Sequence, residues 1–290
     1  MIRILFLCST AFFCCGLFAG STLAASSTEY LLTDRPDFSL GIGFDYETGD
    51  YGTDSNSDFI SVPLYLDVYP SDRLDLELIV PYVYLRTEDE GVATVLYRTP
   101  SGYTGSAVRG RNRTTTETDD STVSTNNHTS ESGLGDITLT AGYIVVKESQ
   151  TTPQVRPTLY LKFPTADEDK GLGTGEFDYG PGLTLSKWLG DWHLFAEGLY
   201  VVQGDSGLYE TKDYFSYNGG VGHQFNEKVY GAVQVLGATA PADGADDSLE
   251  GQLKWVWRLA PDIALEGYFG TGFSDGSADF SSSVAVFFDF

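Results

Sequence analysis

Cysteine and basic residues are scarce in this chain. The three cysteines, Cys8, Cys14 and Cys15, all lie near the N-terminus. The rest of the chain therefore has no disulfide framework, no cysteine-based metal site and no thiol nucleophile. The chain has 17 Lys and Arg residues against 41 Asp and Glu residues, a formal charge of −24. So acidic a chain is not expected to bind nucleic acid.

Long apolar runs are also missing, apart from one near the N-terminus. Arg3 precedes an apolar stretch over residues 4–18, and small residues follow around Ala24. This layout predicts a secretory signal peptide over residues 1–24, cleaved after Ala24 or Ala25. The stretch is too short for a spanning helix, which needs roughly 20 apolar residues. Cleavage removes Arg3 and no acid, so the formal charge becomes −25.

Apolar residues recur at every second position through most of the remaining chain. Such alternation predicts strands with one apolar and one polar face. About twelve are expected, the first after a short periplasmic segment at 25–37. The clearest lie at 38–46, 60–68, 74–84, 137–145 and 155–163, and weaker ones at 177–185, 192–202, 215–225, 229–237, 249–259, 263–271 and 280–290.

The connections between these strands alternate in length. Short ones lie at 69–72, 189–191, 226–228 and 260–262, whereas the others are longer. This favours an all-β fold: a transmembrane antiparallel up-and-down β-barrel over residues 38–290, with short periplasmic turns and longer extracellular loops. The longest connection, 87–131, is either a mobile surface loop or a loop folded inward as a constriction. A soluble β-sandwich or barrel would show the same alternation.

Other features favour the bacterial outer membrane over a soluble fold. Phe290 resembles the C-terminal assembly signal of outer-membrane proteins, so lipids and the barrel-assembly machinery are expected partners. Tyrosine and tryptophan are typical of the membrane interfaces of barrels. The aromatic residues expected there are Tyr46, Tyr82, Tyr84, Trp188, Trp192, Tyr200, Trp255 and Trp257.

The polar phase of the strands predicts the residues that line the lumen. Twelve strands suggest a narrow lumen, because eight-stranded barrels are filled by side chains and porins of sixteen leave a channel. The charges could line a water-filled path that favours cations, or form a closed salt-bridge network. The candidates are Asp45, Asp67, Asp75, Glu77, Asp136, Arg156, Lys162, Glu197, Glu250, Lys254, Arg258 and Glu266.

Catalytic motifs are absent from the sequence. A His–Ser pair at His128 and Ser130 could activate a hydroxyl, but a polar loop is the simpler interpretation. His193 lies about 13 Å along its strand from Glu197, too far to be oriented by it. His223 falls on the apolar phase. The sequence has no nucleophile elbow and no histidine pair with metal-site spacing. No enzyme activity, cofactor or metal is predicted.

Three short segments carry a family resemblance: TDRPDF at 33–38, SGLGD at 132–136, and LKFPT at 161–165 leading to GLGTG at 171–175. With these segments the chain resembles the outer-membrane transporter family of the meta-pathway of phenol degradation. The resemblance implies a barrel that takes up small molecules, aromatic ones included. The glycines at 171, 173 and 175 are expected to form a flexible loop, because glycine permits positive φ.

The sequence thus supports three hypotheses. The first is a monomeric outer-membrane channel that passes small solutes, aromatic or hydrophobic ones included, through a narrow acidic lumen. The second is a structural or surface-interaction barrel with a closed lumen. The third is an outer-membrane hydrolase, which would depend on His128.

Overall fold

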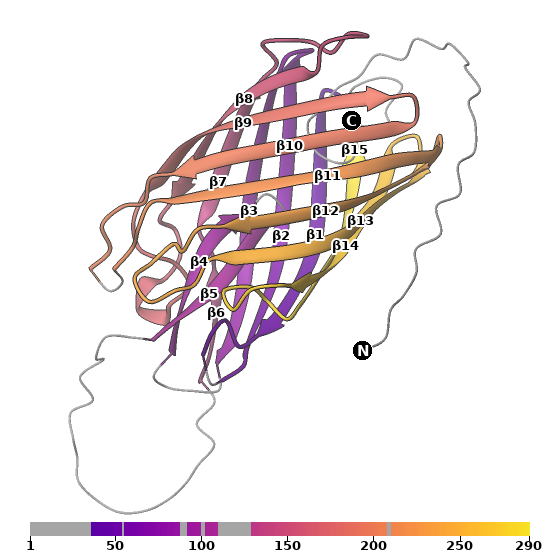
Figure 1. Ribbon diagram of the computed structural model, residues 1–290. Coiled ribbons are helices and arrows are strands. Elements are labelled where there is room, and N and C mark those ends of the chain that lie inside the picture. The colour runs from indigo at the N-terminus through magenta and orange to yellow at the C-terminus, as the bar shows by residue number, and fades with distance from the viewer. Residues whose placement is uncertain (1–35, 54, 88–91, 100–101, 110–128, 208–209) are drawn as a thin grey trace, which may run out of the picture.

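Nearly all the regular structure is β-strand (Figure 1). The computed structural model describes residues 36–53, 55–87, 92–99, 102–109, 129–207 and 210–290. Within these ranges the one helical element is a 3-10 turn at Glu168–Lys170, and no helix there is long and apolar enough to cross a membrane. The predicted signal peptide, and all but the end of the segment 25–37, lie outside the described residues.

The strands follow one another with few interruptions. Their bounds are β1 Phe38–Gly49, β2 Ser57–Ser71, β3 Leu74–Thr87, β4 Val92–Thr99, β5 Gly102–Arg109, β6 Thr129–Leu134, β7 Ile137–Tyr143, β8 Gln154–Phe163, β9 Asp178–Leu189, β10 Trp192–Val201, β11 Tyr214–Asn226, β12 Val229–Ala238, β13 Ser248–Ala260, β14 Ile263–Gly272 and β15 Phe280–Asp289.

These strands form a closed antiparallel ring. Consecutive strands from β7 to β15 pair in order, β15 pairs with β1, β1 with β2 and β2 with β3, and β3 pairs with β7 to complete the circle. β6 and β7 both pair with β3 and share one position, while β4 and β5 form a separate hairpin. The ring therefore has twelve positions, and the predicted up-and-down barrel is confirmed.

The two ends of the chain meet at the seam between β1 and β15. The Asp37 N–H donates to the Phe290 carbonyl at 2.8 Å, and the Phe290 N–H donates to the Phe38 carbonyl at 2.9 Å. The Phe38 and Phe290 rings stack with centroids 4.9 Å apart. Pairing here matters because an unpaired strand edge cannot be hydrated within a bilayer.

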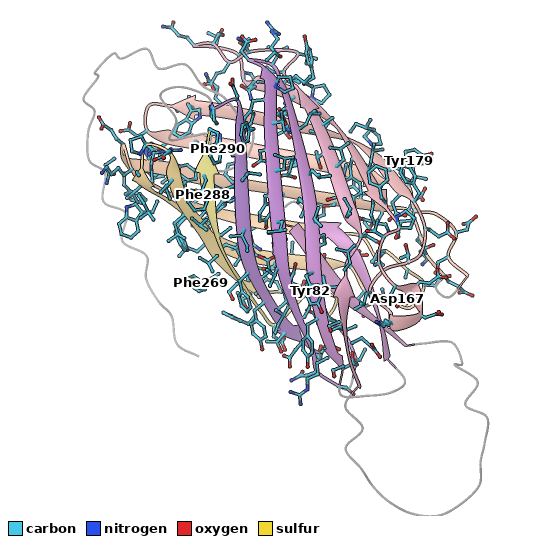
Figure 2. The ribbon with its side chains drawn as sticks, turned by 180° about the vertical axis from the view of Figure 1, so that it is seen from behind. Tyr82, Asp167, Tyr179, Phe269, Phe288 and Phe290 are labelled. Atoms are coloured by element: carbon cyan, nitrogen blue, oxygen red, sulfur yellow. The ribbon has the colours of Figure 1, made fainter. Side chains whose placement is uncertain are left out.

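Apolar side chains cover the outside of the ring (Figure 2). Val233 is 63% exposed, Leu253 55% and Leu64 51%. Their strand neighbours Gln234 and Gln252 are buried. An exposed apolar band around a polar interior is the arrangement of a membrane barrel and the reverse of a soluble one.

Aromatic residues are numerous at both ends of this outer face. Trp192 and Trp257 lie near one end of their strands, and Tyr179 and Tyr200 near the other, all between 45% and 54% exposed. This agrees with aromatic girdles at two interfaces. The interface prediction is wrong for Trp188, which packs inside the barrel against Tyr230 and its neighbours. β9 continues to Leu189, which places Trp188 on the inward phase.

The short connections, at the end we call the turn end, join β2 to β3, β9 to β10, β11 to β12 and β13 to β14. All four agree with the sequence-based expectation. One longer connection, 144–153, also lies at this end. At the opposite end, called the loop end, lie the connections 50–56, 164–177, 202–213, 239–247 and 273–279.

A charge placed on the outer face tests its contact with lipid. We expect Val233→Arg to lower the free energy of unfolding by about 2–4 kcal/mol in a bilayer, as a lipid-facing arginine does near the midplane. Denaturant unfolding in liposomes would measure this, with Val233→Leu as the matched control. A value within about 0.5 kcal/mol of wild type, typical of a water-exposed site, would contradict a lipid-facing surface.

Candidate functional site: the inner face of the barrel

Eleven of the twelve charged residues predicted to face the lumen lie on the inward phase of their strands, and the twelfth, Asp136, lies just before β7. Six are buried: Asp67, Asp75, Asp136, Lys162, Glu250 and Arg258. Six are half-buried: Asp45, Glu77, Arg156, Glu197, Lys254 and Glu266. Partial exposure of inward side chains means that water-accessible space reaches them inside the ring.

Asp75 on β3 and Arg156 on β8 form a close ion pair. Arg156 Nε donates to Asp75 Oδ1 at 2.9 Å, and its terminal nitrogen contacts the other carboxylate oxygen. The Asp75 side chain is 5% exposed and the Arg156 side chain is 11% exposed. A two-point guanidinium–carboxylate contact is among the strongest polar pairings. Glu77 and Glu197 also lie within electrostatic range of Arg156, so carboxylates outnumber cations here.

Glu250 lies in a hydrogen-bonded chain on the inner face. It accepts hydrogen bonds from Ser281 and from the Gln252 amide, the latter at 3.0 Å. Gln234 Nε2 in turn donates to Gln252 Oε1 at 2.7 Å. This chain ties β12, β13 and β15 together.

A second charged contact lies near the turn end. Arg258 approaches Asp289 at 3.2 Å and donates to the Pro261 carbonyl at 2.6 Å. The same carboxylate accepts a hydrogen bond from Ser39 at 2.6 Å. These contacts hold β13, β15 and β1 together beside the seam.

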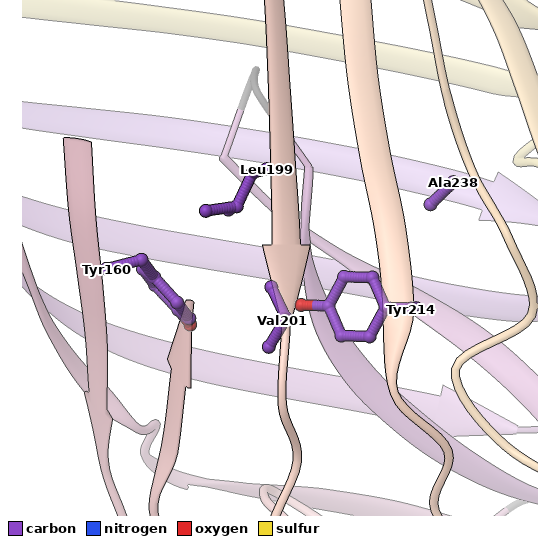
Figure 3. Packing of buried hydrophobic residues seen from close by; sticks show 5 residues of the cluster. All are labelled: Tyr160, Leu199, Val201, Tyr214 and Ala238. Atoms are coloured by element: carbon purple, nitrogen blue, oxygen red, sulfur yellow. The ribbon is translucent and has the colours of Figure 1, made fainter. Parts of the chain in front are cut away.

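Apolar clusters fill other parts of the interior. Figure 3 shows the Tyr214 ring pointing toward Val201, within a cluster that also includes Tyr160, Leu199 and Ala238. Nearer the turn end a second group surrounds His193, which is 0% exposed. Its ring stacks on Trp188 at 4.6 Å and on Phe195 at 5.2 Å, and its Nδ1 lies 3.0 Å from the Tyr230 hydroxyl.

The histidines offer no catalytic arrangement among the described residues. His193 is enclosed by aromatic rings, and His223 packs against Trp192 on the outer face. His128, on which the hydrolase hypothesis depends, lies outside the described residues. No group of three His, Cys, Asp or Glu side chains in the described ranges could hold a metal ion.

The hairpin β4–β5 crosses the interior of the ring (Figure 1). β4 contacts β11 and β12, whereas β5 contacts β2. β2 and β11 occupy opposite positions in the twelve-membered ring. A hairpin that touches both must lie between them. For β4 and β5, the contacts favour the inward one of the two alternatives given for the segment 87–131, and the sequence did not predict these two strands.

The connection 164–177 is also turned inward at the loop end. Leu172 is 0% exposed and packs against Phe59, Val83 and Leu85 from the inner faces of β2 and β3. Thr174 is 1% exposed. Gly171 and Gly175 have the expected positive φ, at 72° and 73°, but the loop between them is packed inward, because Leu172 lies in a buried cluster.

Sequence reasoning missed several residues of the inner face. Glu47 and Asp178 are buried with 4% and 3% exposure. Asp289 takes part in the contacts at the seam. Glu47 follows Asp45 in the same phase and could have been found by extending the predicted strand 38–46 by one residue. Asp178 is the first residue of β9, which the sequence predicted to begin one residue earlier. Its role is apparent only from its contacts with residues that are distant in sequence.

Outside the membrane-spanning strands, the turn end carries an exposed ion pair. Lys147 in the connection 144–153 contacts Asp72. Its hydrogen bond and charge hold the pKa of the Asp72 carboxyl below its usual value.

Residues 64–290 match the protein family described as "Putative MetA-pathway of phenol degradation". The match covers well over half of the chain, including all strands from β3 onward. The chain belongs to this family. No curated protein matches it.

Two solved structures share the fold of this family member. An outer-membrane channel from Pseudomonas putida F1 is 15% identical, with a TM-score of 0.64, and the match covers 93% of this chain and 100% of that one. The NanC porin is 12% identical, with a TM-score of 0.51 and coverage of 87% and 100%. Neither is an enzyme. The closed ring, its apolar outer face and these matches identify an outer-membrane β-barrel.

Breaking the inner ion pair tests its contribution. We expect Asp75→Asn to lower the free energy of unfolding by about 3–5 kcal/mol, because the Arg156 side chain, which is 11% exposed, would lose the carboxylate that it contacts directly. Denaturant titration in detergent measures this. Asp72→Asn, which breaks an exposed pair, should have a much smaller effect, because water already screens that pair. Equal effects of the two changes would contradict the structure.

Proposed function

We propose that this protein is a narrow channel through which small solutes cross the outer membrane, with a preference for cations over anions. The observation that carries the proposal is the closed ring with an apolar outer face and accessible charged side chains within. Family membership and the fold shared with the P. putida channel support it.

The proposed cation preference follows from the charges that remain accessible. Asp45, Glu77, Glu197 and Glu266 are half-buried on the inner face, whereas Lys254 and Arg156 are the half-buried cations among the predicted lumen residues. Arg156 is already paired with Asp75. Charges of one sign within low-dielectric walls concentrate counter-ions. An anion would meet net repulsion along the same path.

The proposed solutes are small, and aromatic ones are included. The family description concerns phenol degradation, and the interior presents the rings of Tyr65, Trp188 and Phe195, each half-buried. Faces of aromatic rings attract both other rings and organic cations. The hairpin β4–β5 limits the solute size, because it occupies part of a lumen that twelve strands already make narrow.

Planar-bilayer recording tests the proposal. The wild-type barrel should give discrete steps with a cation-selective reversal potential across a salt gradient. We expect Glu77→Gln combined with Glu266→Gln to reduce this selectivity, because both carboxylates are half-buried on the inner face and each change removes one negative charge there. Glu227→Gln, in an exposed turn, is the control. Unchanged selectivity in the double variant would refute the role of these carboxylates.

Removing the hairpin tests the constriction. A chain lacking residues 92–109, with a short Gly-Ser linker, should still form a heat-modifiable barrel, since the ring closes without β4 and β5. Its single-channel conductance should rise roughly twofold or more, because the hairpin would no longer occupy the lumen. Conductance equal to wild type would place the hairpin outside the conducting path.

The paired charges favour a second candidate, a structural barrel with a closed lumen. Arg156–Asp75, Arg258–Asp289 and the contacts of Lys162 make part of the interior a salt-bridge network. This candidate predicts no current from wild type and none after removal of the hairpin. The recordings above therefore separate the two.

A further inference from the structure

Two of the short motifs meet in space at the loop end. SGLGD at 132–136 joins β6 to β7, and GLGTG at 171–175 lies in the connection between β8 and β9. Gly133 faces Leu172, and a methyl group at Gly133 would lie 3.0 Å from the Leu172 side chain. At Gly173 it would lie 2.8 Å from Asp136 Oδ2. The glycines therefore make room for one segment to lie against the other.

Lys162, near the end of β8, lies at the centre of this contact. Its ammonium group is 2.6 Å from Asp178 Oδ2 and 3.3 Å from Asp136 Oδ2, and it donates to the Thr174 hydroxyl at 2.7 Å. The side chains of Lys162, Asp136 and Asp178 are at most 5% exposed. All three ammonium protons have acceptors, which a buried lysine requires.

The two carboxylates extend the contact to the surrounding backbone. Asp136 Oδ1 accepts from the N–H groups of Thr165 and Ala166 at 3.1 and 3.0 Å. Asp178 Oδ1 accepts from the Gly204 N–H at 3.0 Å. A single buried cation thus connects the start of β7, the end of β8, the start of β9 and two connections.

Leu172 fixes the far side of the connection. It packs against Phe59, Val83 and Leu85, which belong to β2 and β3. β7 and β3 lie between β8 and β2 in the ring. The connection therefore extends roughly 10–15 Å across the sheet, at the usual spacing between strands. The connection therefore covers the inner wall at the loop end. Asp167, Glu168 and Asp169 in the same connection are exposed and add negative charge there.

We propose that the connection 164–177 is a fixed constriction at the mouth of the channel, and that Lys162 and Leu172 are the residues that position it. The inference rests on the proposed channel function. Asp136 and Lys162, expected from the sequence to line the lumen, then act by holding this constriction, since neither is accessible enough to meet a solute.

The test compares Lys162→Met and Leu172→Ala with wild type in planar bilayers, after heat-modifiability has shown that each barrel is folded. Removing the ammonium leaves two buried carboxylates facing each other, and removing the leucine empties the contact with β2 and β3. Both variants should admit larger poly(ethylene glycol) molecules and show a conductance roughly twofold higher, as expected for a wider lumen.

Leu172→Met should behave like wild type, because it keeps the apolar volume. Leu134→Ala, which changes an exposed leucine of β6, is the matched control. Folded variants with wild-type conductance and size limit would overturn the inference. If wild type and all variants are silent, the proposed channel function fails instead.

Thiol labelling keeps the inference testable without any current. Val83 is 1% exposed beneath Leu172, and the described residues contain no cysteine. Val83→Cys should resist an impermeant maleimide in the otherwise native chain and react when Lys162→Met is added. Ready labelling in the native background, or none after Lys162→Met, would overturn the proposal.

Discussion

The barrel depends on the backbone pairing that closes β1 against β15 and against β2. A sheet within a bilayer has no water to satisfy an open edge, so only a closed ring leaves no unpaired row of peptide groups. The register runs without a break from Ser39–Asp289 to Thr48–Phe280. Closure fixes which face of every strand turns inward. Each charged residue of the interior owes its position to this constraint.

Once the ring is closed, the interior must accommodate charge. Asp75 and Arg156 form a close ion pair, and Glu77 and Glu266 are half-buried on the inner face. Paired charges stabilise the wall, because removing one partner leaves the other buried. The half-buried carboxylates are the groups on which the proposed selectivity depends. We therefore attribute stability and the proposed selectivity to different charged residues of the interior.

The period of two in the sequence is enough to predict the ring and the inward phase of its charges. It identifies Asp45 or Lys254 as inward because neighbouring residues on a strand face opposite sides. It cannot reveal the role of Leu172, whose partners Phe59 and Val83 are distant in sequence, or the close approach of Gly133 to Leu172. The positive φ of Gly171 and Gly175 was expected from the sequence, whereas the close packing at Gly133 and Gly173 depends on contacts that only the structure shows.

The hairpin β4–β5 escapes prediction for a related reason. Its segment contains too little apolar surface to fold alone, and the contacts with β2, β11 and β12 exist only after the barrel has closed around it. The prediction that Trp188 lies at a membrane interface failed for a similar reason. Its residue type suggests a membrane interface, but the length of β9 places it inside.

A solute-uptake measurement tests most directly whether small solutes cross an acidic lumen. Liposomes containing the wild-type barrel would be exposed to benzylammonium or benzoate, which have a similar size and opposite charge, with protein-free liposomes as the background. The account predicts faster protein-dependent swelling with benzylammonium. Equal rates, or faster uptake of benzoate, would contradict it.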